Sequence, residues 1–74
     1  MNKKESGQIV AGALLRSRVR SRLEYLAASN NVTIQIFESK TWMQSLYEFV
    51  IEGEDKNIDD FNSQYYAWVE QFEK

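Results

Sequence analysis

The stretch LLRSRVRSRLEYLAA, residues 14–28, decides how the first third of the chain folds. It carries an arginine at every second position over half its length: Arg16, Arg18, Arg20 and Arg22. On a strand the four side chains share one face, whereas on a helix they separate into two pairs. The choice between strand and helix therefore decides whether the sequence contains one continuous basic surface for phosphates.

The surrounding residues favour the helix. The segments IVAGALL and LEYLAAS on either side are rich in alanine and leucine, which have high helix propensity. A helix also aligns four apolar residues on one stripe: Leu15, Val19, Leu23 and Leu26. Gly12 falls on the same stripe of the helix. A strand, by contrast, would place two serines, Ser17 and Ser21, in the core. We therefore predict a helix over residues 8–28, preceded by a disordered tail at residues 1–7.

Helical geometry divides the four arginines between the two flanks of the apolar stripe. At 100° per residue, Arg16 and Arg20 lie about 40° apart on one flank, and Arg18 and Arg22 lie about 40° apart on the other. Glu24 follows Arg20 by four residues, a spacing at which opposite charges attract on a helix. The sequence thus predicts two pairs of arginines and no single basic track.

Two segments in the middle of the chain predict a β-hairpin. In residues 32–38, VTIQIFE, a strand places Val32, Ile34 and Ile36 on one face and Thr33, Gln35 and Phe37 on the other, and the β-branched content agrees with a strand. Residues 42–52, WMQSLYEFVIE, fit either a strand or a helix that begins after Thr41 and stops at Gly53. We predict a strand, because YEFVI is β-prone and because the strand at 32–38 needs a neighbour.

A second helix is predicted over residues 58–73. Its apolar residues recur at helical spacing: Ile58, Phe61, Tyr65, Trp68 and Phe72. The asparagines of SNN, residues 29–31, suit the left-handed conformation that ends a helix, and GEDKN, residues 53–57, is predicted to be a loop. The predicted fold is therefore α+β with the order α-β-β-α, in one small domain over residues 1–74.

A two-stranded hairpin packed on two helices leaves its edge strands unpaired. A lone hairpin is marginally stable in water, and the chain has no cysteine to form a disulfide. Two chains that pair their edge strands would complete a four-stranded antiparallel sheet. The sequence therefore predicts a homodimer.

Composition argues against most catalytic chemistry. The 74 residues include no histidine and no cysteine, the commonest general base and the usual thiol nucleophile. The acidic residues around 53–57 lack the spacing of a calcium loop, and the scattered glycines form no phosphate loop. We therefore predict a protein that is not an enzyme and has no cofactor or metal. No stretch approaches the ~20 apolar residues of a membrane span, and no targeting segment is visible, so we expect a cytoplasmic protein without a membrane partner.

The net charge of −2 conceals an asymmetry between the two halves of the chain. Residues 1–40 contain seven Lys or Arg and three Asp or Glu, a net charge of +4. Residues 41–74 contain two Lys or Arg and eight Asp or Glu, a net charge of −6. The simplest interpretation is attraction between the halves, and the functional alternative is a basic surface for an anionic partner.

Two sets of residues are candidates for binding. The first set has side chains that protein interfaces favour: Trp42, Tyr65, Tyr66, Trp68, Val69 and Phe72. These residues also suit a core or a homodimer contact. The second set contains the arginines that suit an anion or a nucleic acid: Arg16, Arg18, Arg20 and Arg22. We predict a small regulatory module that binds another protein, with a nucleic-acid-binding regulatory protein as the alternative.

Overall fold

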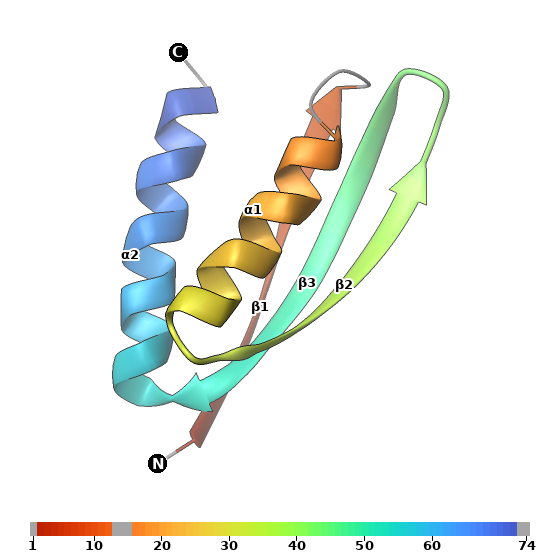
Figure 1. Ribbon diagram of the computed structural model, residues 1–74. Helices are drawn as coiled ribbons and strands as arrows, with labels where there is room; N and C mark the ends of the chain where they lie inside the picture. Colours follow the sequence, from red (N-terminus) through yellow and green to blue (C-terminus); the bar gives the residue numbers. More distant parts are fainter. Residues whose placement is uncertain (1, 13–15, 73–74) are drawn as a thin grey trace.

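The structure is a computed structural model in which residues 2–12 and 16–72 are described. It has three strands and two helices in the order β-α-β-β-α (Figure 1). The elements are β1 (Asn2–Gly12), α1 (Arg16–Ser29), β2 (Thr33–Lys40), β3 (Gln44–Glu54) and α2 (Asp55–Phe72). The fold is therefore α+β, as the sequence predicts.

The three strands form one antiparallel sheet with the order β1-β3-β2. The central strand β3 pairs with β1 from Asn2 opposite Glu54 to Gly12 opposite Gln44. On its other side β3 pairs with β2, where Ile36 lies opposite Phe49. Since β1 and β2 both run antiparallel to β3, they run parallel to each other, and α1 makes the crossover between them (Figure 1).

Both helices cover the same face of the sheet (Figure 1). Side chains alternate along each strand, so that every second residue of β3 from Ser45 to Ile51 is buried beneath the helices. From α1, Val19, Leu23 and Leu26 are buried against this face. The apolar stripe predicted for the first helix is thus confirmed at these three positions, while Leu15 lies outside the described residues.

Aromatic side chains from α2 and β3 fill the centre of the core. The ring of Phe49 lies 6.2 Å from that of Phe61 and 5.2 Å from that of Tyr65, in tilted and edge-on arrangements. Such offset geometries are the favourable ones for aromatic pairs. The Phe49 ring also covers Gly7 of β1, where an added Cβ would lie 2.7 Å from the ring. A glycine at position 7 therefore lets the edge strand β1 close over the aromatic core.

The end of α1 is fixed by two asparagines. The Asn30 side chain donates from Nδ2 to the carbonyl oxygen of Leu26 at 2.8 Å. Asn31 has a φ of 57°, in the left-handed region that asparagine tolerates better than most residues. The chain then turns directly into β2. The role predicted for the SNN segment is confirmed.

The first strand is the main correction to the predicted fold. We expected a disordered tail at residues 1–7 and a helix from residue 8, but residues 2–12 form β1 and α1 begins at Arg16. Residues 9–12, IVAG, lead into alanine and leucines that favour helix, but pairing with β3 makes these four residues part of a strand. Gly12 therefore belongs to a strand and not to the apolar stripe of α1. The order is β-α-β-β-α in place of the expected α-β-β-α.

The rest of the predicted order holds with shifted boundaries. Residues 44–52 of the segment 42–52 belong to β3, so the helical alternative for this segment is wrong, while Trp42 and Met43 lie in the turn before the strand. The segment 53–57 is not a loop, because β3 continues to Glu54 and α2 begins at Asp55. The third strand comes from the same chain, which removes the reason for completing a four-stranded sheet by dimerisation.

Candidate functional site

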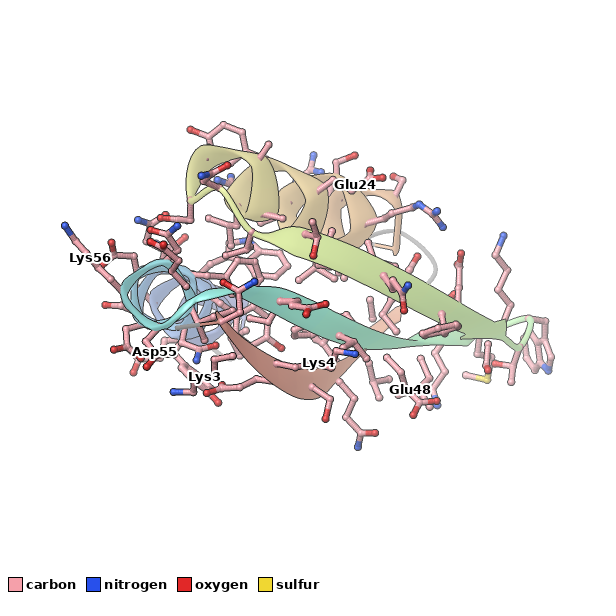
Figure 2. The ribbon with its side chains drawn as sticks, turned by 90° about the horizontal axis from the view of Figure 1, so that it is seen from below. Lys3, Lys4, Glu24, Glu48, Asp55 and Lys56 are labelled. Atoms are coloured by element: carbon pink, nitrogen blue, oxygen red, sulfur yellow. The ribbon has the colours of Figure 1, made fainter. Side chains whose placement is uncertain are left out.

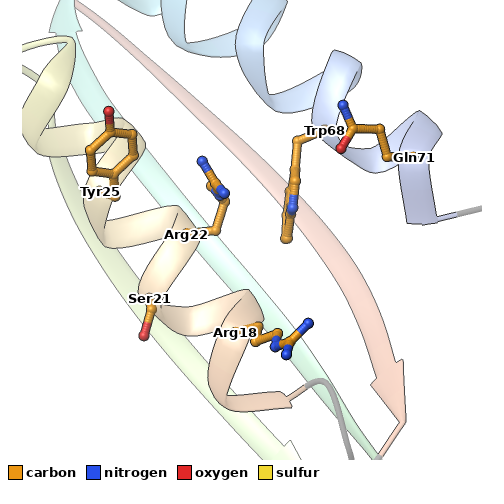
Figure 3. A pocket seen from close by; sticks show the side chains of 6 residues that line it. All are labelled: Arg18, Ser21, Arg22, Tyr25, Trp68 and Gln71. Carbon is orange, nitrogen blue, oxygen red and sulfur yellow. The ribbon is translucent and has the colours of Figure 1, made fainter.

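An open groove of about 740 Å³ lies between the two helices on the outer side of the molecule (Figure 3). Four of its lining residues come from α1 and two come from α2. They are Arg18, Ser21, Arg22, Tyr25, Trp68 and Gln71. The groove therefore joins members of both predicted sets, two arginines from the second and one tryptophan from the first.

The position of the arginines follows from the helical repeat of α1. Arg18, Arg22 and Tyr25 recur at spacings of four and three residues, so they share one face of the helix. The buried residues Val19 and Leu23 hold the adjacent face of α1 against the sheet. Arg18 and Arg22 are thereby held at the edge of the core with their side chains exposed beside α2.

The two arginines of the groove, Arg18 and Arg22, have no acidic partner among the residues that the structure describes. Within the described residues, neither Arg18 nor Arg22 forms an ion pair with a carboxylate. The Arg22 guanidinium lies 5.6 Å from the centre of the Tyr25 ring, a distance at which a cation is attracted to an aromatic face. Tyr25 thus helps to orient Arg22, while the charges of both arginines stay available to a ligand.

Arg20 lies on the other flank of α1 and is engaged by acids of the same chain. Its guanidinium is 4.0 Å from Glu24 and 3.7 Å from Glu38 of β2. Glu38 also accepts a hydrogen bond from the Tyr47 hydroxyl at 2.9 Å. The predicted separation of Arg20 from Arg18 and Arg22 is confirmed, whereas the side chain of Arg16 lies outside the described ones.

The aromatic candidates are distributed over different parts of the molecule. Tyr65 is 7% exposed and belongs to the core, where burial raises the pKa of its hydroxyl. Trp68 and Val69 are partly buried and pack against the core, and Tyr66 is 63% exposed on α2. Trp42 is 85% exposed at the turn between β2 and β3. Of the five aromatic and apolar candidates whose side chains are described, only Trp68 lines the groove, and the side chain of Phe72 lies outside the described ones.

Sequence reasoning did not identify Ser21, Tyr25 and Gln71 as site residues. The spacing of Tyr25 from Arg18 and Arg22 is a signal that was present, because residues three and four apart share a helix face. Gln71 carries no such signal. Its place depends on how α2 packs beside α1, which the sequence pattern does not specify.

Attraction between the two halves of the chain is visible at the start of the sheet. The amine of Lys3 lies 3.0 Å from Glu5 and 3.8 Å from Asp59 of α2. Asn62 of α2 donates a hydrogen bond to Glu5 at 2.8 Å, and this bond together with Lys3 lowers the pKa of the Glu5 carboxyl. Glu5 in turn raises the pKa of Lys3. These interactions connect β1 to α2 and so stabilise the fold. None of these residues lines the groove.

The described residues contain no group of three or more acidic side chains placed to hold a metal ion. Within the same part of the chain, neither helix is long and apolar enough to cross a membrane. Comparisons of the chain with family models, with curated protein sequences and with solved structures give no match. The site must therefore be interpreted from its own geometry and charge.

Proposed function

We propose that this protein is a non-enzymatic module that binds an acidic segment of another protein in the groove between α1 and α2. The observation that carries the proposal is the pair of arginines, Arg18 and Arg22, which face the groove without an acidic partner in the described chain. Guanidinium groups bind carboxylates through two parallel hydrogen bonds, which gives both strength and orientation.

The aromatic side chains of the groove support the same function. Trp68 forms part of one wall and Tyr25 part of the other (Figure 3). Tryptophan, tyrosine and arginine are the residues that most often dominate the energy of protein interfaces. Trp68 packs against the core and is therefore held in place before a ligand arrives. We infer that a partner segment combines acidic side chains for the arginines with an apolar side chain that contacts Trp68.

Nucleic-acid binding is the second candidate function, because arginines beside aromatic rings also suit a single strand. Affinity for nucleic acid depends on neutralising many phosphates. Here two arginines are available on one flank of α1, and Arg20 is engaged by acids on the other flank. The chain as a whole carries a net charge of −2. Two available cations suit a short acidic segment better than a polyphosphate backbone.

Homodimerisation stays a prediction, although it was argued from a two-stranded hairpin with unpaired edges. The strand β1 of the same chain already extends that hairpin to three strands. Each edge strand carries an acidic side chain on its helix-facing side, Glu5 on β1 and Glu38 on β2. Inward-facing charges on edge strands disfavour pairing with another sheet. Any dimer is therefore expected to form through another surface. Sedimentation at micromolar concentration tests the prediction. A dimer should give twice the mass of the 8.7 kDa chain.

The proposed function is tested with a labelled peptide that contains four glutamates and two leucines, and with a matched peptide in which glutamine replaces each glutamate. We expect the wild type to bind the acidic peptide, and Arg18→Gln/Arg22→Gln to bind it about tenfold more weakly, because two exposed charge pairs are lost. Arg20→Gln is the control on the opposite flank and should bind as the wild type does. Equal affinity of the wild type and the double variant contradicts the proposal.

The same variants distinguish the nucleic-acid alternative. For a single-stranded oligonucleotide, loss of two phosphate contacts reduces the slope of log affinity against log salt by roughly 1.4 units. Under the proposed function, binding of the oligonucleotide is weak at ~0.15 M salt and insensitive to the double substitution. Submicromolar binding of the oligonucleotide with that loss of slope would replace the protein-binding proposal by the alternative.

A further inference from the structure

No helix or strand of residues 2–12 and 16–72 covers the face of the sheet away from the helices (Figure 2). In that view Lys4 and Glu48 lie on the side of the sheet opposite α1. The exposed face is mixed in character, with Val10 of β1 and Phe37 of β2 both exposed. Leu46 and Val50 of β3 are half-buried on the same face. The groove between the helices is on the other side, so this face is an independent surface.

Glu48 occupies the middle of this open face. It belongs to the central strand, where its register neighbours are Gln8 on β1 and Phe37 on β2. Along β3 the residues on either side of it on this face are Leu46 and Val50. Within the described chain no cation forms an ion pair with Glu48. Among the described residues its carboxylate thus has no compensating cation, and its neighbours on this face are the apolar Phe37, Leu46 and Val50 together with the polar Gln8.

A shallow hollow of about 660 Å³ lies beside this carboxylate. The outward-facing side chains around it are Ser6, Gln8, Phe37, Glu48 and Val50. Gly7 and Phe49 alternate to the helix-covered face, so they contribute backbone to its floor. Phe37 is 57% exposed, which leaves much of its ring accessible to a ligand.

We propose that this hollow binds an arginine side chain of a partner protein. A guanidinium can hydrogen-bond both oxygens of the Glu48 carboxylate and stack on the neighbouring ring of Phe37. Arginine suits the site better than lysine, because its planar cation combines both interactions and is less strongly hydrated. The partner is a protein and not a nucleic acid, since the carboxylate repels phosphate. This inference goes beyond the proposed function and does not depend on the groove.

The probe for the test is Nα-acetyl-arginine amide, and its matched control is the neutral analogue Nα-acetyl-citrulline amide. We expect the arginine probe to shift the backbone amide signals of the residues around the hollow in the full chain, above all those of Gln8, Phe37 and Glu48. Citrulline has a similar shape without the charge, so it should leave these signals in place. Equal shifts with both probes overturn the proposal.

Two substitutions locate the binding to the hollow. Glu48→Gln should weaken binding of the arginine probe about fivefold, because the charge pair is lost. Glu52→Gln removes a carboxylate from the same face of the same strand, two residues beyond Val50 and outside the lining of the hollow, and should leave the affinity unchanged. If both variants weaken binding equally, the probe responds to net charge and the proposed site is wrong.

Phe37→Leu tests the aromatic contribution independently of the carboxylate. We expect it to weaken binding of the arginine probe about two- to fivefold, while the residual shifts stay centred on Glu48. Unchanged affinity in this variant contradicts the stacked geometry. Shifts of the same amides that grow with protein concentration, without any probe, would show that a second copy of the chain occupies this face and would overturn the assignment to a different partner.

Discussion

At the scale of single residues, Ser45 shows where the core is imperfect. It faces the helices from β3 with no exposed surface, and its hydroxyl has no hydrogen-bond partner among the described residues. A buried polar group without a partner costs free energy, because it loses its hydrogen bonds to water and gains none in return. The site is therefore one at which a smaller, apolar side chain should be tolerated.

Replacement of Ser45 by alanine is expected to raise the free energy of unfolding by about 1 kcal/mol, since it removes the unpaired hydroxyl and little volume. Urea unfolding at neutral pH measures the change. Ser6→Ala is the matched control, because Ser6 lies exposed on β1 and its loss should change stability by less than about 0.5 kcal/mol. A clear loss of stability in Ser45→Ala would show that the hydroxyl has a stabilising partner.

Sequence patterns predict the surroundings of some single residues and not of others. The burial of Val19 and Leu23 was predictable, because their four-residue spacing defines one helix face. The role of Gly7 was not, since it depends on the ring of Phe49, forty-two positions later in the chain, lying directly over it. A local pattern contains no information about a contact of this kind.

At the scale of elements, β1 is held in place by polar interactions with α2 as well as by β3. Asn62 donates to Glu5 at 2.8 Å, and Lys3 lies between Glu5 and Asp59. The hydrogen bond from Asn62, followed by the one from Lys3, lowers the pKa of Glu5 below its ordinary value of 4.5. The attachment of β1 to α2 should therefore depend on pH.

The sign of this dependence follows from the direction of the shift. Because the pKa of Glu5 is lower in the folded state, its stabilising contribution is present above the unfolded value of 4.5 and is lost as pH falls through the folded value. We expect Glu5→Gln to lose less stability than the wild type on acidification, as measured by urea unfolding at a series of pH values. Glu70→Gln, at an exposed position of α2, should follow the wild-type profile. Identical profiles for Glu5→Gln and the wild type contradict this role of Glu5.

The elements differ in how far the sequence predicts them. The strand β2, the strand β3 and the helix α2 have clear periodic patterns, and each was predicted with shifted boundaries. The strand β1 was missed, because its segment IVAG runs into leucines and alanines that favour helix. Its strand conformation is imposed by eleven register pairs with β3, which form only when the whole sheet assembles.

At the scale of the whole molecule, the fold separates two surfaces of opposite character. The helix side presents the groove with Arg18 and Arg22, and the open side of the sheet presents the hollow with Glu48. Placing both helices on one face of a three-stranded sheet creates both surfaces at once (Figure 1). The sequence indicated the arginines and Trp68 as separate candidates. Their meeting in one groove depends on the packing of α1 beside α2, which sequence patterns do not specify.

The central claim is that the groove between the helices binds an acidic protein segment, and a map of backbone amide shifts on addition of the glutamate–leucine peptide tests it most directly. We predict shifts concentrated from Arg18 to Tyr25 on α1 and from Trp68 to Gln71 on α2, with the open face of the sheet around Glu48 unchanged. Shifts absent from both helical segments, or equally large for the glutamine peptide, would contradict the claim.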